Sequence, residues 1–164
     1  MAPPRARRYS CPMPRRALSW LRRTAIPALG ILTTACAAER DPQPITVVGM
    51  DYAFQAPETV SAGPAVIRFE SRGKVRHEMV FAEIRDDVPN ALFADSLMRG
   101  GAVRAFRATG SAVLFAAPGE KNDGVALRVV FERGHRYALW CQFRDSATAP
   151  KHQALGMFKL VAGR

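Results

Sequence analysis

Near its C-terminus the chain reads Trp140-Cys141-Gln142-Phe143 and, after a polar segment, His152-Gln-Ala-Leu-Gly156-Met157. Ten residues separate Cys141 from His152, and four separate His152 from Met157. The three side chains offer a thiolate, an imidazole and a weak thioether, which are ligands that suit a transition metal with soft character. A strand that ends at the cysteine, followed by one rigid loop, would bring all three to the same point.

A second imidazole would complete the ligand set of a blue-copper site, in which two histidines and a cysteine form a plane and a methionine lies farther away. The chain has three histidines: His77, His135 and His152. His135 begins the strand that leads to Cys141, and six residues of extended chain would separate the two by about 20 Å. We therefore expect His135 to be a surface residue, which leaves His77 as the second imidazole.

Each of these residues alone also has a structural interpretation. A histidine at the start of a strand is more often structural than ligating, and a methionine in a final strand more often belongs to the core. An unpaired cysteine is equally well a small buried apolar residue. The prediction of a copper site therefore rests on the conjunction of four residues in the order His77, Cys141, His152 and Met157.

Residues 1–36 have the features of an export signal. The segment contains seven arginines and no acidic residue, and its apolar run at 24–35 is too short to span a bilayer permanently. It ends in Leu32-Thr-Thr-Ala-Cys36, which is similar to a bacterial lipobox and predicts lipidation of Cys36. Ala35-Cys36-Ala37 also fits an ordinary signal peptidase, so cleavage after Ala37 is the alternative.

Residues 37–44 are expected to form a short polar linker to a single domain over 45–164, located in the periplasm or cell envelope and held at the membrane by the lipid. The net charge of +10 is concentrated in the export segment, because 17 basic and 14 acidic residues remain beyond residue 36. This near-neutral balance argues against a nucleic-acid partner.

Cys11 lies in the export segment, which leaves Cys141 as the only thiol of the domain. An unpaired thiol in an oxidising compartment needs a reason, and metal ligation is one.

From Ile45 onward, short β-rich runs are separated by glycine and proline, a pattern typical of an all-β protein. Strands are expected at 45–54, 58–60, 65–71, 77–84, 111–116, 125–131, 135–141 and 157–161. Seven or eight strands at this spacing predict a Greek-key β-sandwich. Residues 88–100 predict one short helix, inserted between strands and without chemistry of its own.

Five stretches within residues 45–162 are Asp51-Tyr-Ala-Phe, Val60-Ser-Ala-Gly63, Phe69-Glu-Ser-Arg-Gly-Lys-Val-Arg-His77-Glu, Gly134-His-Arg-Tyr-Ala-Leu-Trp-Cys141 and His152-Gln-Ala-Leu-Gly-Met157. Together they resemble the cupredoxins, the type 1 copper family of plastocyanin and azurin, and particularly its exported bacterial members. The resemblance implies a cupredoxin-like sandwich that holds one copper ion. In it, His77 and His152 would be equatorial imidazoles, Cys141 the equatorial thiolate and Met157 the axial thioether.

The chain departs from the best-known members in two places. The loop from Cys141 to His152 is longer than in plastocyanins and azurins, and it carries Arg144, Asp145 and Lys151. Glu78 stands where plastocyanins have asparagine, and its carboxylate either bonds to the site or faces water. Neither departure removes a ligand, but both affect the geometry and the potential of the site.

The sequence thus predicts a monomeric electron-transfer protein with a transient redox partner. Electrons are expected to leave through an exposed edge of His152, beside a small apolar docking patch made of Ala149, Pro150, Ala154 and Leu155. The alternatives are a copper-holding protein for tolerance or delivery, and a metal-free envelope domain. We do not expect an enzyme, because the sequence shows no Cys-x3-Cys or His-x-His pattern and no Ser-His-Asp set.

Overall fold

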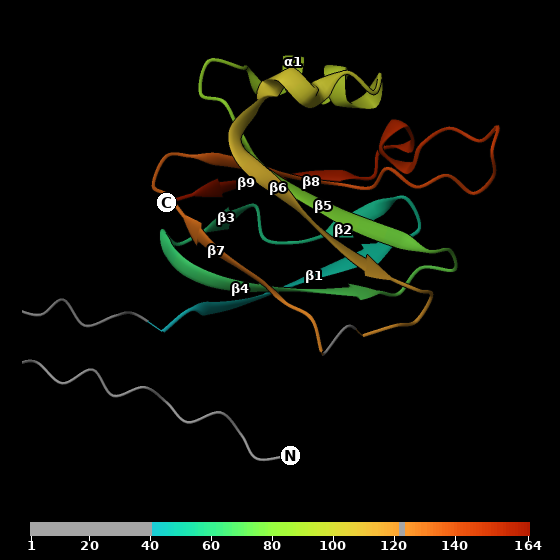
Figure 1. The fold of residues 1–164 in the computed structure, drawn as a ribbon, viewed down its shortest axis with the longest axis horizontal. Coiled ribbons are helices and arrows are strands. Elements are labelled where there is room, and N and C mark those ends of the chain that lie inside the picture. The colour runs from blue at the N-terminus through green and yellow to red at the C-terminus, as the bar shows by residue number, and fades with distance from the viewer. Residues whose placement is uncertain (1–40, 122–123) are drawn as a thin grey trace, which may run out of the picture. The chain divides into compact units, whose positions relative to one another are not determined.

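The computed structural model describes residues 41–121 and 124–164, which form two β-sheets packed face to face with a helix on one side (Figure 1). The predicted export segment, with Cys36, and the first part of the linker lie outside the described residues. The first strand begins at Gln43, within the predicted linker. In the described part of the chain, no helix is long and apolar enough to cross a bilayer.

The first sheet has the strand order β2 (Ala53–Gln55), β1 (Gln43–Met50), β4 (Gly63–Ser71) and β7 (Leu127–Phe131). The second has the order β3 (Thr59–Val60), β9 (Phe158–Gly163), β8 (Arg136–Trp140), β5 (His77–Ile84) and β6 (Phe106–Ala116). Strands that are neighbours in a sheet are mostly distant in sequence, as in Greek-key folds. The predicted all-β sandwich is confirmed. The strand expected at 45–54 is divided into β1 and the three-residue β2, which pair antiparallel, and the strand expected at 58–60 is the two-residue β3.

The main core lies between the two sheets. In β4 alternate side chains face inward, and Ala65, Ile67 and Phe69 are buried. Full burial of one such large apolar side chain is worth roughly 1.5–3 kcal/mol. Cys141 and Met157 belong to the same buried cluster as these residues. The thiol of Cys141, which is one of the predicted ligands, is therefore part of the apolar core.

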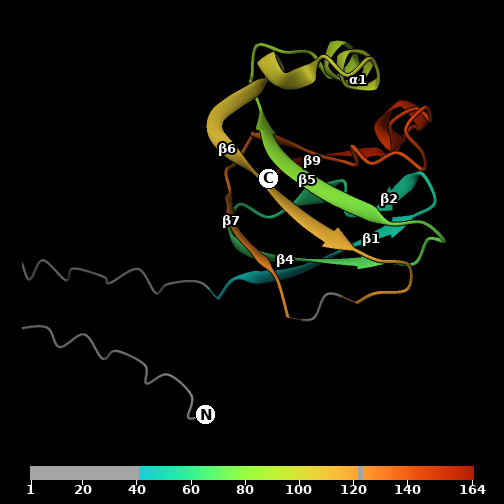
Figure 2. The ribbon, with the colours of Figure 1, turned by 45° about the vertical axis from the view of Figure 1, so that its right-hand side comes forward.

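A second core lies on the outer face of the β5–β8 sheet, beneath α1 (Asn90–Met98) and the 3₁₀ turn η1 (Ala102–Ala105). Figures 1 and 2 show α1 on the side of this sheet that faces away from the first sheet. Phe93 and Leu97 of α1 are buried there with Trp140 of β8. Because both its faces are covered, β5 is buried along almost its whole length, unlike a strand with one wet face. The predicted helix is present and closes this core.

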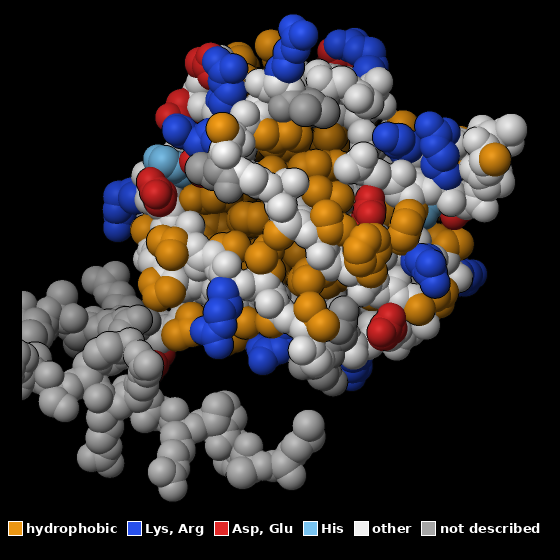
Figure 3. All heavy atoms as spheres, in the orientation of Figure 1, with side chains coloured by type: hydrophobic (Ala, Val, Ile, Leu, Met, Phe, Trp, Pro, Cys, Tyr) orange, Lys and Arg blue, Asp and Glu red, His pale blue; other side chains and the backbone are white. Residues whose placement is uncertain are grey.

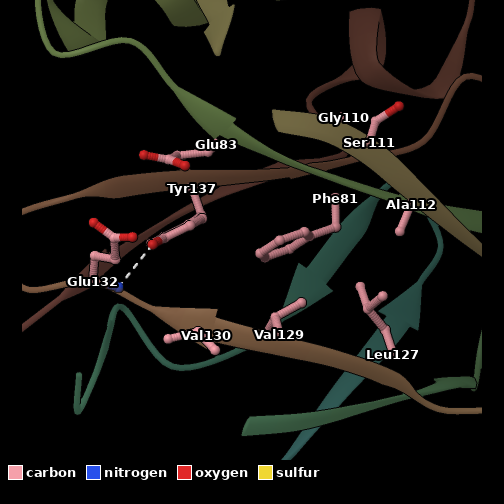
Figure 4. A pocket seen from close by; sticks show the side chains of 10 residues that line it. All are labelled: Phe81, Glu83, Gly110, Ser111, Ala112, Leu127, Val129, Val130, Glu132 and Tyr137. Carbon is pink, nitrogen blue, oxygen red and sulfur yellow. Dashed lines mark hydrogen bonds between the residues drawn. The ribbon is translucent and has the colours of Figure 1, made fainter. Parts of the chain in front are cut away.

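Each of the strands β6 and β7 lies at one edge of its sheet, and the two border an open apolar face (Figure 3). A pocket of about 370 Å³ lies there, with Phe81, Leu127, Val129 and Tyr137 among its lining residues (Figure 4). At its rim the backbone N–H of Glu132 donates to the hydroxyl of Tyr137 across 2.9 Å. None of the four predicted ligands lines this pocket, so the candidate site is built elsewhere.

Candidate metal centre

Three of the predicted ligands meet at one end of the sandwich. His77 is the first residue of β5, Cys141 directly follows β8, and His152 begins the 3₁₀ turn η2 (His152–Leu155). One ligand atom from each lies within 4.8 Å of the others, and all three residues are buried. This is the one such group of three or more His, Cys, Asp or Glu side chains among the described residues. Residues 64 positions apart, His77 and Cys141, become neighbours because β5 pairs with β8.

The ring of His77 is completely buried, and neither of its nitrogens has a hydrogen-bond partner. Its Nε2 atom faces the loop before β5, where a Cβ atom on Gly73 would lie only 2.7 Å away. The nitrogen left for the cluster is therefore Nδ1. Burial, reinforced by the neighbouring His152, lowers the pKa of His77, so that the neutral form is favoured. Buried polar groups nearly always have a hydrogen-bond partner. A buried neutral imidazole without one is therefore what we expect for a histidine whose partner is a metal ion.

The sulfur of Cys141 lies 3.4 Å from Nδ1 of His152 and accepts the backbone N–H of Glu78 at 3.4 Å. Burial raises the pKa of the thiol to about 11, so the metal-free protein keeps this proton at neutral pH. A metal ion that binds the thiolate must displace it. The carboxylate of Glu78 accepts the backbone N–H of Gln142 at 2.9 Å. Glu78 therefore bonds to the site, which was one of the two interpretations left open by the sequence.

The expected exposed edge of His152 is not found. Its side chain is only 1% exposed, and its Nε2 atom lies 3.0 Å from a carboxylate oxygen of Asp145. The long loop after Cys141 brings Asp145 back over the ring. Pro150, Ala154 and Leu155 of the predicted docking patch are exposed and Ala149 is half-buried, but they do not surround an open imidazole edge.

Asp145 also accepts a hydrogen bond from the hydroxyl of Tyr52 at 2.6 Å, and the ring of Tyr52 meets that of His152 edge to face at 5.1 Å. The bonds from Tyr52 and then from His152 lower the pKa of Asp145. The same contact raises the pKa of Tyr52. Asp145 is thus a carboxylate that the two rings hold in place. From the sequence, Asp145 was expected only to make the loop more polar. Nothing local in the sequence pairs it with Tyr52.

Met157 is completely buried in the inter-sheet core. Its backbone N–H donates to the carbonyl of His152 at 3.0 Å, and its carbonyl accepts the N–H of Cys141 at 3.2 Å. Between them, Gly156 makes the turn with a φ of 100°, a conformation that glycine adopts without strain. These backbone bonds attach Met157 to the same corner as Cys141 and His152.

The helix α1 contributes to the site through Gln153, a contact that the sequence did not indicate. The side-chain amide of Gln153 donates to the carbonyl of Leu97 at 2.8 Å, and its backbone N–H donates to the carbonyl of Cys141 at 2.9 Å. The helix α1 was expected to have no chemistry of its own, but it stabilises the turn that carries His152.

His135 lies outside the cluster, as predicted. Its ring is partly buried rather than on the open surface, because Nδ1 pairs with Glu83 at 2.6 Å and Nε2 lies 3.4 Å from Glu132. Arg107 also reaches Glu83 at 2.7 Å. These partners make His135 part of a polar network at the end of β8 away from Cys141.

The donor set fits copper. Two imidazoles and a thiol converge, one imidazole has no hydrogen-bond partner, and a buried thioether is attached to the same turn. Sulfur and imidazole together suit both Cu(I) and Cu(II), whereas magnesium and calcium take oxygen ligands. His77, Cys141, His152 and Met157 are thus positioned for a type 1 copper ion.

No protein-family model matches the chain, and no curated protein matches it in sequence. Its fold is similar to solved structures of two auracyanins and of rusticyanin. A reduced auracyanin from Roseiflexus castenholzii is 16% identical, with a TM-score of 0.48 over 74% of this chain and 97% of that one. Auracyanin A from Chloroflexus aurantiacus, described as a "blue" copper protein, is 20% identical, with a TM-score of 0.42 over 76% and 100%.

Rusticyanin from Thiobacillus ferrooxidans is 18% identical, with a TM-score of 0.45 over 74% of this chain and 76% of that one. At these identities we base the class of the protein on its own topology and side chains. A Greek-key sandwich whose His, Cys and His side chains converge at one end, with a buried Met on the turn that follows, is the cupredoxin arrangement. The resemblance drawn from the sequence is confirmed at the level of the fold.

Proposed function

We propose that this protein binds one copper ion through His77, Cys141, His152 and Met157 and carries single electrons to and from a partner protein. The observation that carries the proposal is the buried ring of His77, whose two nitrogens have no hydrogen-bond partner although the thiol of Cys141 and the ring of His152 are beside it. The carboxylate of Asp51 lies 3.9 Å from its Nε2, beyond hydrogen-bond distance. A structural histidine would be expected to satisfy at least one ring nitrogen.

When bound, a type 1 copper ion would supply reversible one-electron chemistry. The chain's own part is to hold the ligands still, so that little has to move between the two oxidation states. Glu78 donates a backbone N–H to the sulfur of Cys141, and Gln153 anchors the turn of His152 to α1. The surrounding apolar core keeps water away from the thiol. No substrate pocket is required, and we propose a carrier rather than an enzyme.

Absorption and EPR spectra of the full chain after addition of Cu(II) test this proposal. An intense thiolate-to-copper band in the visible, with narrow copper hyperfine splitting, is the expected result, and it should disappear in Cys141→Ala. His135→Ala is the matched control, since that histidine lies outside the cluster, and it should keep the band. A protein that stays colourless, or that binds copper equally well without Cys141, would contradict the proposal.

A copper-holding role is the second candidate, and the closed edge of His152 favours it. Carriers exchange electrons through a surface that a partner can approach, whereas here Asp145 and Tyr52 cover the imidazole. The two functions differ in rate. A fast electron self-exchange between the oxidised and reduced copper forms supports the carrier, while tight binding of Cu(I) with slow exchange supports the holding role.

We further propose that the protein is exported and held at the cell envelope by a lipid on Cys36, where a redox partner binds it transiently. The support is the arginine-rich, acid-free segment 1–36 and its lipobox-like end. Metabolic labelling with a radioactive fatty acid in a bacterial host tests this. Cys36→Ser should abolish the label and Cys11→Ser should keep it. Label retained in Cys36→Ser would instead exclude this anchor.

A further inference from the structure

The ring of His152 has a different partner on each nitrogen. Nδ1 lies 3.4 Å from the sulfur of Cys141, and Nε2 lies 3.0 Å from Oδ1 of Asp145. A carboxylate can only accept, so a neutral ring in this position carries its proton on Nε2 and donates it to Asp145. The lone pair of Nδ1 is then directed at the cluster. The contact with Asp145 therefore selects the tautomer that a metal ligand needs.

Asp145 is itself held from a distant part of the chain. Its second oxygen accepts the hydroxyl of Tyr52, a residue 93 positions earlier in the sequence, at 2.6 Å. The two oxygens of one carboxylate thus connect the β1–β2 turn to the ligand loop. Without this second bond, an exposed aspartate on a long loop would have little reason to stay against His152.

The backbone of Tyr52 has an unusual conformation. Its φ is 61°, and it is the one non-glycine residue with positive φ in the described part of the chain. Bulky side chains rarely adopt this region, and residues that do so tend to occur at functional sites. Here the conformation places the phenol ring edge to face against His152 and its hydroxyl on Asp145.

We propose that Asp145 is a positioning residue that fixes the tautomer and orientation of His152, and that Tyr52 keeps Asp145 in place and seals the outer edge of the ring from water. The inference rests on the proposed function, because the tautomer of His152 decides whether its Nδ1 can bind a copper ion. The contact itself is a property of the metal-free chain. A partner that approaches this side would meet Tyr52 and Asp145 rather than a bare imidazole.

The first test uses the metal-free full chain labelled with ¹⁵N. A long-range ¹H–¹⁵N spectrum reports which ring nitrogen of each histidine carries the proton. For His152 we expect the Nε2–H form, with a proton that exchanges slowly. Asp145→Ala should lose this slow exchange, whereas Asp145→Asn should restore it, because the amide oxygen still accepts a hydrogen bond. Tyr52→Phe keeps the ring and should speed up exchange less than Asp145→Ala does.

Asp87→Ala is the matched control, because Asp87 is an exposed carboxylate that pairs with Arg85 away from the site. It should leave the His152 signals unchanged. A wild-type His152 in the Nδ1–H form, or signals in Asp145→Ala identical to those of the wild type, would overturn the inference. Unchanged signals from His135, which lies outside the cluster, would show that Asp145→Ala is folded, and if it fails to fold, Asp145→Asn and Tyr52→Phe decide.

The second measurement is copper affinity. Loss of such a supporting contact typically weakens metal binding by about 10- to 100-fold, and we expect a loss in this range for Asp145→Ala and none for Asp87→Ala. The two measurements separate the two ideas. If the chain binds no copper but Asp145 sets the tautomer, only the proposed function fails. If copper binds and neither the tautomer nor the affinity depends on Asp145, only this inference fails.

Discussion

The backbone N–H of Glu78 donates to the sulfur of Cys141 across 3.4 Å, and the carboxylate of the same glutamate accepts the N–H that follows the cysteine. Glu78, on the neighbouring strand β5, therefore bonds both to the sulfur of Cys141 and to the backbone of the next residue, Gln142. The first bond depends only on the backbone and survives any substitution that keeps β5 in place. The second depends on the side chain, which makes it testable.

Glu78→Gln should fold with nearly unchanged stability, because its amide oxygen can still accept from Gln142. Glu78→Leu should lower the free energy of unfolding by about 1–3 kcal/mol, since the N–H of Gln142 would lose its buried partner. Urea titration of the metal-free variants measures both. Equal stabilities for the two would show that the hydrogen bond to Gln142 contributes nothing.

Gly73→Ala should disturb His77. The added Cβ atom would lie 2.5 Å from a carboxylate oxygen of Asp51 and 2.7 Å from Nε2 of His77, so one of them must move. Overpacking of this kind usually costs about 1–3 kcal/mol. Thermal unfolding measures this cost, and the copper affinity should fall as well. Gly124→Ala is the control, since its Cβ atom meets nothing within 4 Å, and an equal effect of both substitutions would argue against a specific clash at Gly73.

Gln153→Leu should loosen the turn that carries His152. The carbonyl of Leu97 would lose the amide of Gln153 but keep the backbone N–H of Gly100, so we expect a cost of about 0.5–1.5 kcal/mol in the free energy of unfolding. Amide hydrogen exchange should increase in η2 and in α1 together if the two elements support each other. Gln55→Ala, at an exposed position of β2, should change neither. Increased exchange confined to one of the two elements would disprove the coupling.

The thiol of Cys141 should be unreactive in the folded metal-free protein. Its side chain is completely buried, and its pKa is raised to about 11 from an ordinary value of 9.0. An aromatic disulfide reagent at pH 8 should react with it only after denaturant is added. Fast reaction of native protein in which both Cys11 and Cys36 are replaced would show that the cluster is open to solvent.

The same pKa shift has a consequence for stability. Between pH 9.0 and about pH 11 the folded chain keeps a proton that the unfolded chain releases. The contribution of the neutral thiol is therefore complete below pH 9 and is lost as the pH rises through this window. Cys141→Ala should remove this component of the pH dependence when the melting temperature is followed from pH 8 to 11. A wild-type protein and variant with parallel curves would contradict it.

The pattern of residues was sufficient to predict the sandwich and to name four residues that the structure brings to one corner of it. Strand signals are local, because alternation and the glycine and proline boundaries lie within each segment, and a histidine can be excluded by the reach of an extended strand, as for His135. The resemblance to the cupredoxins then assigned roles to His77, Cys141, His152 and Met157. These local signals do not specify which side chains and backbone groups surround each ligand.

Only the tertiary structure decided what surrounds the ligands. The closed edge of His152 depends on Tyr52 and Asp145, which come from two loops 93 positions apart, and no local pattern specifies such a pairing. The role of α1 likewise depends on one hydrogen bond from Gln153 to Leu97. The sequence by itself determined the order and chemical type of the ligands, because these are properties of the chain. The packing of loops and of α1 decided their tautomer, exposure and support, because hydrogen bonds between distant segments exist only once the two sheets have assembled.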